Sequence, residues 1–199
     1  MARARSGSKG VPRAEREAQI LDAAAAEFAR RGYAATTLAE IAVHAGISKP
    51  LIHSYFTSKQ GLYCACCDRA GRELTERIAD ALAQDHSAMG RGAAVLNAVF
   101  TALEPRPHDW NVLFDRTLPA GSEALEVAKK YRLQLLLQAA EGIAASFADR
   151  LTEPGDLDAL TRVWSAVVSA LVDWWLHNPG ESAADMVARG ERLLDALSM

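Results

Sequence analysis

The sequence contains no long uncharged apolar segment and no run in which polar and apolar residues alternate strictly. Its longest uncharged apolar stretch, residues 163–172, stops at Asp173 and is too short to cross a bilayer. The arginine-rich N-terminus also lacks the apolar core of a signal peptide. We therefore expect a cytoplasmic protein with no membrane partner, and a chain that is helical almost throughout because strand patterns are missing.

Cysteine is scarce, and its positions do not suit a structural role. The three thiols, Cys64, Cys66 and Cys67, fall within one expected helix. An odd, clustered set does not make a disulfide framework, and no nearby histidine or second cysteine pair completes a tetrahedral metal site. Burial as small apolar side chains accounts for them best. The alternative is that Cys64 and Cys67, which share a helix face, ligate a metal or sense an oxidant. We expect no bound metal and no cofactor.

The short motifs that carry catalysis are also missing. The five histidines lie far apart, and the sequence has no phosphate-binding loop, no nucleophile elbow and no HExxH pair. A site assembled in space from distant residues stays open, but nothing in the sequence indicates one. We expect a protein that is not an enzyme and has no catalytic residues.

The sequence is rich in alanine, leucine, arginine and glutamate, which favour helices. Half of its 199 residues are hydrophobic, enough for one sizeable core with a small module attached. Residues 1–60 hold nine lysines and arginines against five acidic residues, whereas residues 61–199 hold thirteen against twenty. A basic N-terminal third on an acidic remainder is typical of an attached nucleic-acid-binding module; an ordinary solvated surface would also explain it.

Capping residues and helix breakers divide the chain into about nine expected helices. Pro12 opens the first helix and Gly32 ends it, and Thr37, Ser48 and Ser58 cap the next three. The helix after Ser58 is expected to run to about residue 84. Further helices are expected over residues 89–103, 110–118, 122–151, 157–177 and 182–197.

Residues 37–59 have the pattern of a helix-turn-helix, whose second helix enters the major groove of DNA. Two short helices are joined by a turn at Gly46, and the small residues Ala42 and Ala45 let them cross closely. The outward face carries side chains that suit phosphates and base edges. A three-helix packing unit with a polar outer face would show the same pattern. The expected DNA contacts are Thr37, Ser48, Lys49, Pro50, His53, Ser54, Tyr55 and Lys59.

The segment Ile20–Tyr63 resembles the N-terminal domain of the TetR family of transcriptional regulators. The resemblance rests on RGYAAT at 31–36, IAVHAGIS at 41–48 and YFTSK at 55–59. It implies a double-stranded DNA operator as partner and the same eight contact residues. The family commonly has tyrosine at the position of His53 and histidine at that of Ser54, so the operator sequence stays open.

We therefore expect an all-α fold of three parts. A flexible basic arm spans residues 1–11, a helix-turn-helix DNA-binding domain spans 12–60, and a larger ligand-binding and dimerisation domain spans 61–199. The arm resembles arms that enter the minor groove, although a solvated, unstructured terminus explains its composition equally well.

The C-terminal helices are expected to form the interface of a homodimer, because one short domain makes few base contacts and operator affinity requires two. Residues 157–177 are apolar on more than one side, which favours burial against a partner; a helix buried in its own chain would look the same. In the resembled family, the last two helices of each subunit form a four-helix bundle. The expected interface residues are Val167, Val168, Leu171, Trp174, Trp175, Met186, Leu193 and Leu194.

The middle helices are expected to enclose a pocket for a small molecule of unknown identity, and their apolar composition suggests a lipophilic one. We expect a repressor that its ligand releases from a palindromic operator, with the helix after Ser58 acting as a lever between pocket and DNA. A helical ligand-binding protein with a vestigial helix-turn-helix is the alternative. The expected ligand contacts are Leu96, Phe100, Leu103, Trp110, Phe114, Leu137, Gln138 and Trp164.

Overall fold

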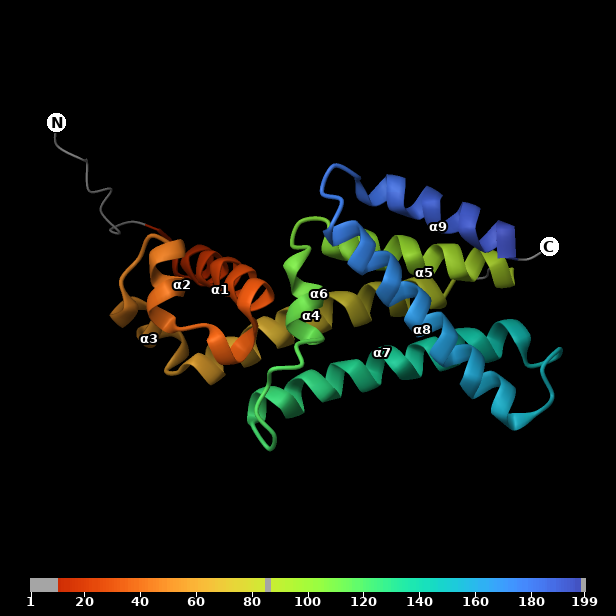
Figure 1. Ribbon diagram of the computed structural model, residues 1–199, viewed down its shortest axis with the longest axis horizontal. Coiled ribbons are helices and arrows are strands. Elements are labelled where there is room, and N and C mark those ends of the chain that lie inside the picture. The colour runs from red at the N-terminus through yellow and green to blue at the C-terminus, as the bar shows by residue number, and fades with distance from the viewer. Residues whose placement is uncertain (1–10, 85–86, 198–199) are drawn as a thin grey trace.

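The computed structural model describes residues 11–84 and 87–197, and this part of the chain is helical and without strands (Figure 1). The predicted all-α fold is confirmed. Apart from Val11, the expected arm over residues 1–11 lies outside the described residues. None of the helices described is long and apolar enough to cross a membrane. The helices are α1 (Arg13–Ala35), α2 (Leu38–His44), α3 (Lys49–Phe56), α4 (Lys59–Leu82), α5 (Ala88–Leu103), α6 (His108–Leu113), α7 (Glu123–Phe147), α8 (Pro154–Leu176) and α9 (Ala183–Leu197).

The helices α1–α3 form a small unit at one end of the molecule, which we call the N-terminal unit (Figure 1). From it α4 runs into the larger part, where it packs against α5, α6 and α7. The short helix α6 lies between the two parts and contacts both α1 and α4. α4 and α6 therefore connect the N-terminal unit to the other helices.

A serine or threonine N-cap begins each of five helices, and the caps predicted at Thr37, Ser48 and Ser58 are confirmed. In each case the side-chain hydroxyl accepts a hydrogen bond from a backbone N–H of the first turn. At α2 and α9 an acidic side chain also accepts the backbone N–H of the capping residue, which completes a capping box. These caps are Thr37, Ser48, Ser58, Ser122 and Ser182.

Several predicted boundaries are wrong: the first helix continues past Gly32 to Ala35, the helix expected to reach residue 151 ends at Phe147, and two others differ for identifiable reasons. The helix expected over 110–118 ends at Leu113, because the Asp115 carboxylate accepts the backbone N–H of Thr117 at 2.7 Å and so competes with helix formation. The helix expected from residue 157 begins instead at Pro154. Proline suits a first helical position, where no intrahelical partner is required of its nitrogen.

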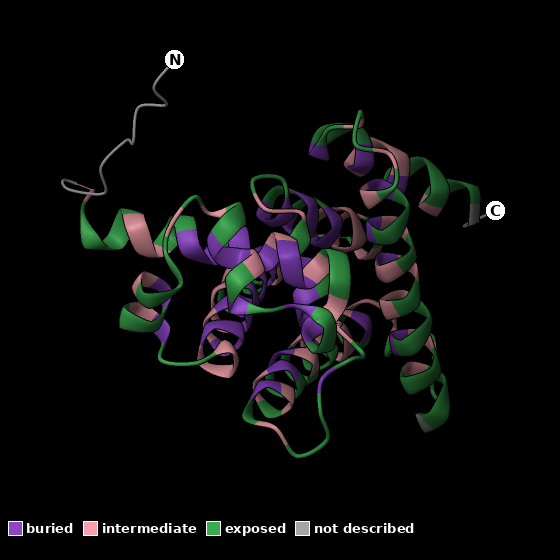
Figure 2. Ribbon diagram, turned by 60° about the vertical axis from the view of Figure 1, so that its left-hand side comes forward, coloured by how far each residue is buried: buried purple, intermediate pink, exposed green. Residues whose placement is uncertain are grey.

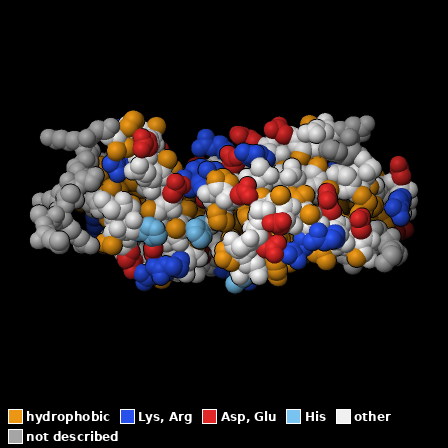
Figure 3. Space-filling model, turned by 90° about the horizontal axis from the view of Figure 1, so that it is seen from above, with side chains coloured by type: hydrophobic (Ala, Val, Ile, Leu, Met, Phe, Trp, Pro, Cys, Tyr) orange, Lys and Arg blue, Asp and Glu red, His pale blue; other side chains and the backbone are white. Residues whose placement is uncertain are grey.

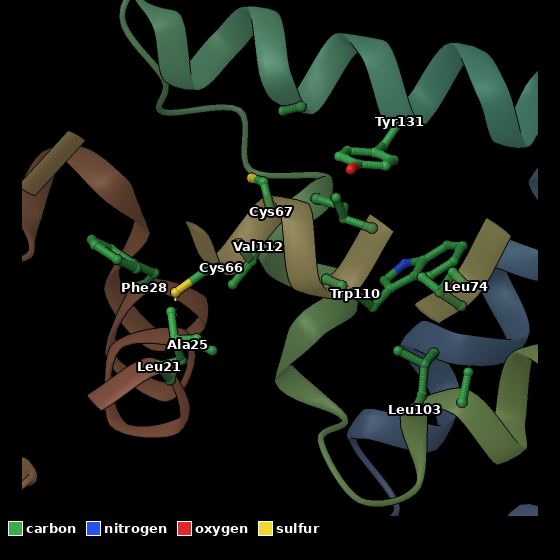
Figure 4. Close-up of a cluster of buried hydrophobic side chains, with 14 of the residues drawn as sticks. Leu21, Ala25, Phe28, Cys66, Cys67, Leu74, Leu103, Trp110, Val112 and Tyr131 are labelled. Atoms are coloured by element: carbon green, nitrogen blue, oxygen red, sulfur yellow. Dashed lines mark hydrogen bonds between the residues drawn. The ribbon is translucent and has the colours of Figure 1, made fainter. Parts of the chain in front are cut away.

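The three cysteines lie in the core of the molecule, as predicted, and are unpaired. Figure 4 shows Cys66 pointing toward Leu21 and Ala25 of α1, and the Cys66 thiol donates a hydrogen bond to the Leu21 carbonyl at 3.7 Å. Burial raises the pKa of Cys64 to about 11 and raises the pKa of Cys66 and Cys67 as well. All three therefore remain protonated thiols at neutral pH, which are weak nucleophiles.

A glycine permits the close contact between α4 and α7. Gly71 is buried under the ring of Tyr131, and a Cβ atom built on it would lie 2.1 Å from Tyr131 Cγ. The Tyr131 hydroxyl donates a hydrogen bond to Asp68 at 2.9 Å, one turn before this glycine on α4. The ring is thus held against the backbone of α4.

Within the N-terminal unit, a buried carboxylate joins α1 to α2. Glu27 of α1 lies 2.9 Å from His44 Nδ1 and accepts a hydrogen bond from Arg30 at 2.6 Å. The hydrogen bonds from His44 and Arg30 hold the pKa of Glu27 below its ordinary value of 4.5, against the opposing effect of burial. A carboxylate whose pKa is lower in the folded state than in the unfolded state stabilises the fold at pH values above the unfolded-state pKa. This stabilisation is lost as the pH falls through the folded-state pKa.

Replacing Glu27 with glutamine is expected to lower the free energy of unfolding by about 1 kcal/mol at pH 7. Glu27 takes up its proton near pH 4.5 in the unfolded chain but only at lower pH in the folded protein, so the difference between the two proteins should shrink as the pH falls below about 4.5. Urea unfolding followed by circular dichroism from pH 7 to pH 3 measures it. Glu15→Gln, exposed on the same helix, is the control; a Glu27→Gln deficit that stays constant across this range would contradict the assignment.

Candidate DNA interface and ligand cavity

The helix α3 separates a buried face from an exposed one (Figure 2). Ile52 and Phe56 are buried on the side of α3 that packs against α2 and α4, which directs the other face of the helix outward. The turn before α3 is made by Gly46, whose φ of +65° favours glycine. Five of the predicted DNA contacts are exposed on or beside this face: Ser48, Lys49, Pro50, His53 and Ser54.

Several of these polar side chains already bond to their own chain. The hydroxyl of Ser54 donates to the Leu51 carbonyl at 2.7 Å, and His53 Nδ1 lies 2.8 Å from the Thr57 carbonyl. Among the described residues Lys49 has no hydrogen-bond or ion-pair partner, so its ammonium group is available to an external anion. Thr37, at the start of α2, is exposed, but its hydroxyl belongs to the capping box.

Lys59 is held by the protein itself. Its ammonium group donates to the carbonyls of Tyr33 at 2.9 Å and Thr36 at 3.1 Å, and lies 4.2 Å from the centre of the Tyr33 ring. It thereby fixes the link between α1 and α2 to the start of α4. The sequence predicts a phosphate contact for this lysine and does not reveal the bonds to these carbonyls.

Tyr55, also predicted to contact DNA, is half-buried, and the Arg13 guanidinium lies 5.2 Å from the centre of its ring. A cation over an aromatic face is an attractive contact. It brings the start of α1 beside α3 and adds a positive charge there. No sequence pattern pairs two residues so far apart, so the contact between Arg13 and Tyr55 was not predicted.

The segment after α6 fastens the N-terminal unit to the larger part. The Asp115 carboxylate accepts the backbone N–H of Tyr33 at 2.6 Å, and the Thr117 hydroxyl accepts that of Ala34 at 3.3 Å. Gly32 has a φ of +76°, and a Cβ on it would lie 2.7 Å from the Thr117 hydroxyl. The chain can approach this closely only because residue 32 has no side chain.

An ion-pair cluster around the buried Asp109 adds a second connection between the N-terminal unit and the larger part. Arg69 of α4 pairs with Asp22 of α1 at 2.6 Å and with Asp109 of α6 at 3.2 Å. Arg106 also pairs with Asp109, at 3.1 Å. Asp109 is buried, and two arginines compensate the cost of burying its charge.

A cavity of about 430 Å³ lies between helices of the larger part, with walls from α4 to α9. Four of the predicted ligand contacts line it: Trp110, Phe114, Gln138 and Trp164. The structure places the other four elsewhere. Leu96, Phe100 and Leu103 are buried in the core outside the lining, where Phe100 packs edge-on against Trp175. Leu137 is 59% exposed on α7.

The cavity wall is apolar apart from two arginines, a glutamine and three serines. Arg91, Arg132 and Ser146 were not predicted to line it. Arg91 is the one charged residue in the apolar segment AMGRGAAVLNAVF, and this isolated charge is the sequence signal that could have identified it. Val163 also lines the cavity and is 58% exposed, which places it at the rim.

The predicted interface residues divide into buried and exposed sets. Val168, Trp175 and Met186 are buried within this chain, and Val167, Val168 and Leu194 line the cavity. Leu171 packs partly buried against the core. Trp174 and Leu193 are exposed, at 39% and 47%, and Arg189 lies 4.3 Å from the Trp174 ring centre. Figure 3 shows acidic and basic side chains interspersed over one face of the molecule.

Comparisons with known proteins agree on one family. Residues 20–66 match the family described as "Bacterial regulatory proteins, tetR family". The chain is 29% identical to the HTH-type transcriptional activator FasR of Mycolicibacterium smegmatis, over 90% of this chain and 81% of that protein. It is 28% identical to the HTH-type transcriptional regulator TtgR of Pseudomonas putida, over 91% and 89%.

The crystal structure of a TetR-like transcriptional regulator from Rhodococcus sp. RHA1 has the same fold. It superposes with a TM-score of 0.72 at 26% identity, over 92% of this chain and 96% of that one. The family match over residues 20–66, the similarity to two regulators along most of the chain and the fold shared with this structure agree. Residues 20–66 therefore match the TetR family of bacterial transcriptional regulators, and the chain as a whole is similar to transcriptional regulators with this fold.

Proposed function

We propose that the protein is a homodimeric repressor that binds a palindromic operator and leaves it when a small lipophilic molecule fills the cavity. The observation that carries the proposal is the outer face of α3, which is polar and exposed over a buried apolar face. In this proposal residues 12–60 bind DNA, and residues 61–199 bind the ligand and the second subunit.

The proposed DNA contacts are of two kinds. Lys49 and the hydroxyls of Ser48 and Ser54 suit phosphates, which position a protein on the duplex. Lys49, His53 and Pro50 lie on the exposed face that would meet base edges. Tyr55 lies beside this face and contacts the Arg13 guanidinium. Lys59 contributes indirectly, because its hydrogen bond to the Tyr33 carbonyl holds the end of α1 against the start of α4.

Exposed apolar side chains support a homodimer. Trp174 of α8 and Leu193 of α9 are partly open to solvent, although both are large and apolar. Covering them with the same surface of a second copy would give the twofold symmetry that a palindromic operator requires.

The helix α4 supports a link between cavity and operator. Its residues Ile78 and Leu82 line the cavity, and its first residue, Lys59, holds the N-terminal unit. A ligand that shifts α4 would change the separation of the two DNA-binding units. It must favour the shifted state by about 1–3 kcal/mol to alter operator affinity by a regulatory factor.

Selection of bound sequences from random duplexes, at one stated salt concentration, tests the proposal. We expect a palindromic consensus with two half-sites, and sedimentation of a complex holding two subunits. A reporter gene placed behind the selected site distinguishes repression from the activation named for FasR. If no duplex is enriched, the proposed function is wrong.

A further inference from the structure

The wall of the cavity carries positive charge without any negative charge. Among the residues described, Arg91 of α5 and Arg132 of α7 line it, and no aspartate or glutamate does. The other lining side chains are neutral, and most are aliphatic or aromatic. Charges beside an apolar space are costly unless they are paired or hydrogen-bonded, so the partners of each arginine decide what the cavity attracts.

Arg132 is already occupied by the protein. Its guanidinium donates to the backbone carbonyls of Leu113 and Asp115, and lies 5.7 Å from the centre of the Phe114 ring. These contacts use the fork of the guanidinium to hold the end of α6. Its role is accordingly structural, at the end of the cavity nearest the N-terminal unit.

Arg91 has only one hydrogen bond within the described residues. Its Nη1 donates to the Ser146 hydroxyl at 2.8 Å, and that hydroxyl in turn donates to the Gly142 carbonyl at 2.8 Å. Ser146 therefore serves Arg91 as an acceptor and fixes its direction from α5 toward α7. No carboxylate of the described residues pairs with this guanidinium, whereas Arg69 has two such partners. A guanidinium carries five N–H groups, so most of those of Arg91 are left for another acceptor.

We propose that the cavity binds an amphipathic anion, an apolar chain that ends in a carboxylate or phosphate and pairs with Arg91. The guanidinium fork binds either oxyanion through two parallel hydrogen bonds. The chain lies against the apolar wall, which includes Leu82, Val95 and Phe147. The inference rests on the proposed function, because it names the ligand class of that same cavity.

Four probes with the same ten-carbon chain test the proposal: decanoate, decyl phosphate, decanol and decylamine. Their dissociation constants are measured by isothermal titration calorimetry on the full chain. At least one of the two anions is expected to bind about tenfold to a hundredfold more tightly than decanol. The anion that binds more tightly identifies the terminal group. Equal affinity for decanol, tighter binding of decylamine, or no binding of any probe would overturn the proposal.

Two substitutions of Arg91 make the test specific. Arg91→Met keeps an apolar stem and should bind the anions no better than decanol, while Arg91→Lys keeps the charge without the fork and should retain part of the preference. Arg72→Met removes an exposed arginine of α4 outside the cavity and should change nothing. An unchanged preference in Arg91→Met, or its complete loss in Arg72→Met, would contradict the role of Arg91.

Operator binding separates this inference from the proposed function. If the wild type binds no duplex yet prefers the anions through Arg91, the ligand class stands and the regulatory function fails. If the duplex is bound and no anion is preferred, the ligand class fails alone.

Discussion

The variant Gly71→Ala is expected to lose about 3 kcal/mol of unfolding free energy, among the largest effects of adding one methyl group. The new Cβ would lie 2.1 Å from Tyr131 Cγ and 2.3 Å from Cδ1. The ring is held through its hydroxyl by Asp68, so it cannot turn aside without breaking that hydrogen bond. Relief requires α4 and α7 to separate along their contact. Urea unfolding followed by circular dichroism measures the loss.

Gly155→Ala provides the matched control for this prediction. Gly155 lies in the first turn of α8, is exposed, and would have no atom within 4 Å of a new Cβ. Its substitution should change the free energy of unfolding by no more than about 0.5 kcal/mol. If Gly71→Ala were as mild as this control, the close packing of α4 on α7 would be wrong.

The variant Lys49→Ala is expected to weaken binding to the selected operator by about tenfold to a hundredfold, because the proposed dimer loses the contact twice. Lys49 is exposed and has no partner among the described residues, so its removal should leave folding unchanged. If the lysine contacts phosphate, the slope of log affinity against log salt should also fall by about two. Fluorescence anisotropy at several salt concentrations measures both quantities.

Lys129→Ala is the control for Lys49→Ala, because it removes the same charge from an exposed position on α7. It should leave operator affinity within about twofold of wild type, since its distance from α3 leaves only a screened charge effect. Equal losses in the two variants would mean that overall charge alone governs binding. Lys59→Ala does not make a clean test, because it also releases the carbonyls of Tyr33 and Thr36.

The helix-turn-helix was predictable because its signals are local. A cap such as Thr37 or Ser48 acts within three residues, and Gly46 makes its turn through its own φ angle. The end of α6 was not predictable in this way. It depends on Asp115, whose carboxylate also accepts the N–H of Tyr33, far away in the sequence.

The cavity was predicted only in part, for a reason that lies in α5. This helix packs against α4, α7 and α9, so apolar residues occur around most of its circumference and periodicity does not reveal which side is hollow. Leu96 and Phe100 accordingly face other helices, although both are as apolar as the true lining. The one charged residue of α5 between Ala88 and Phe100, Arg91, does line the cavity, and its charge would have indicated the hollow side better than apolar periodicity.

The bonds from Asp115 and Thr117 to residues 33 and 34 connect the segment beside the cavity to the end of α1, and they do so without α4. Arg132 and Phe114 line the cavity, and Arg132 donates a hydrogen bond to the backbone carbonyl of Asp115. An occupant that displaced either side chain would pull directly on the chain entering α2. In the proposed regulator, these hydrogen bonds therefore transmit a change in the cavity to the link between α1 and α2 without a bend in α4.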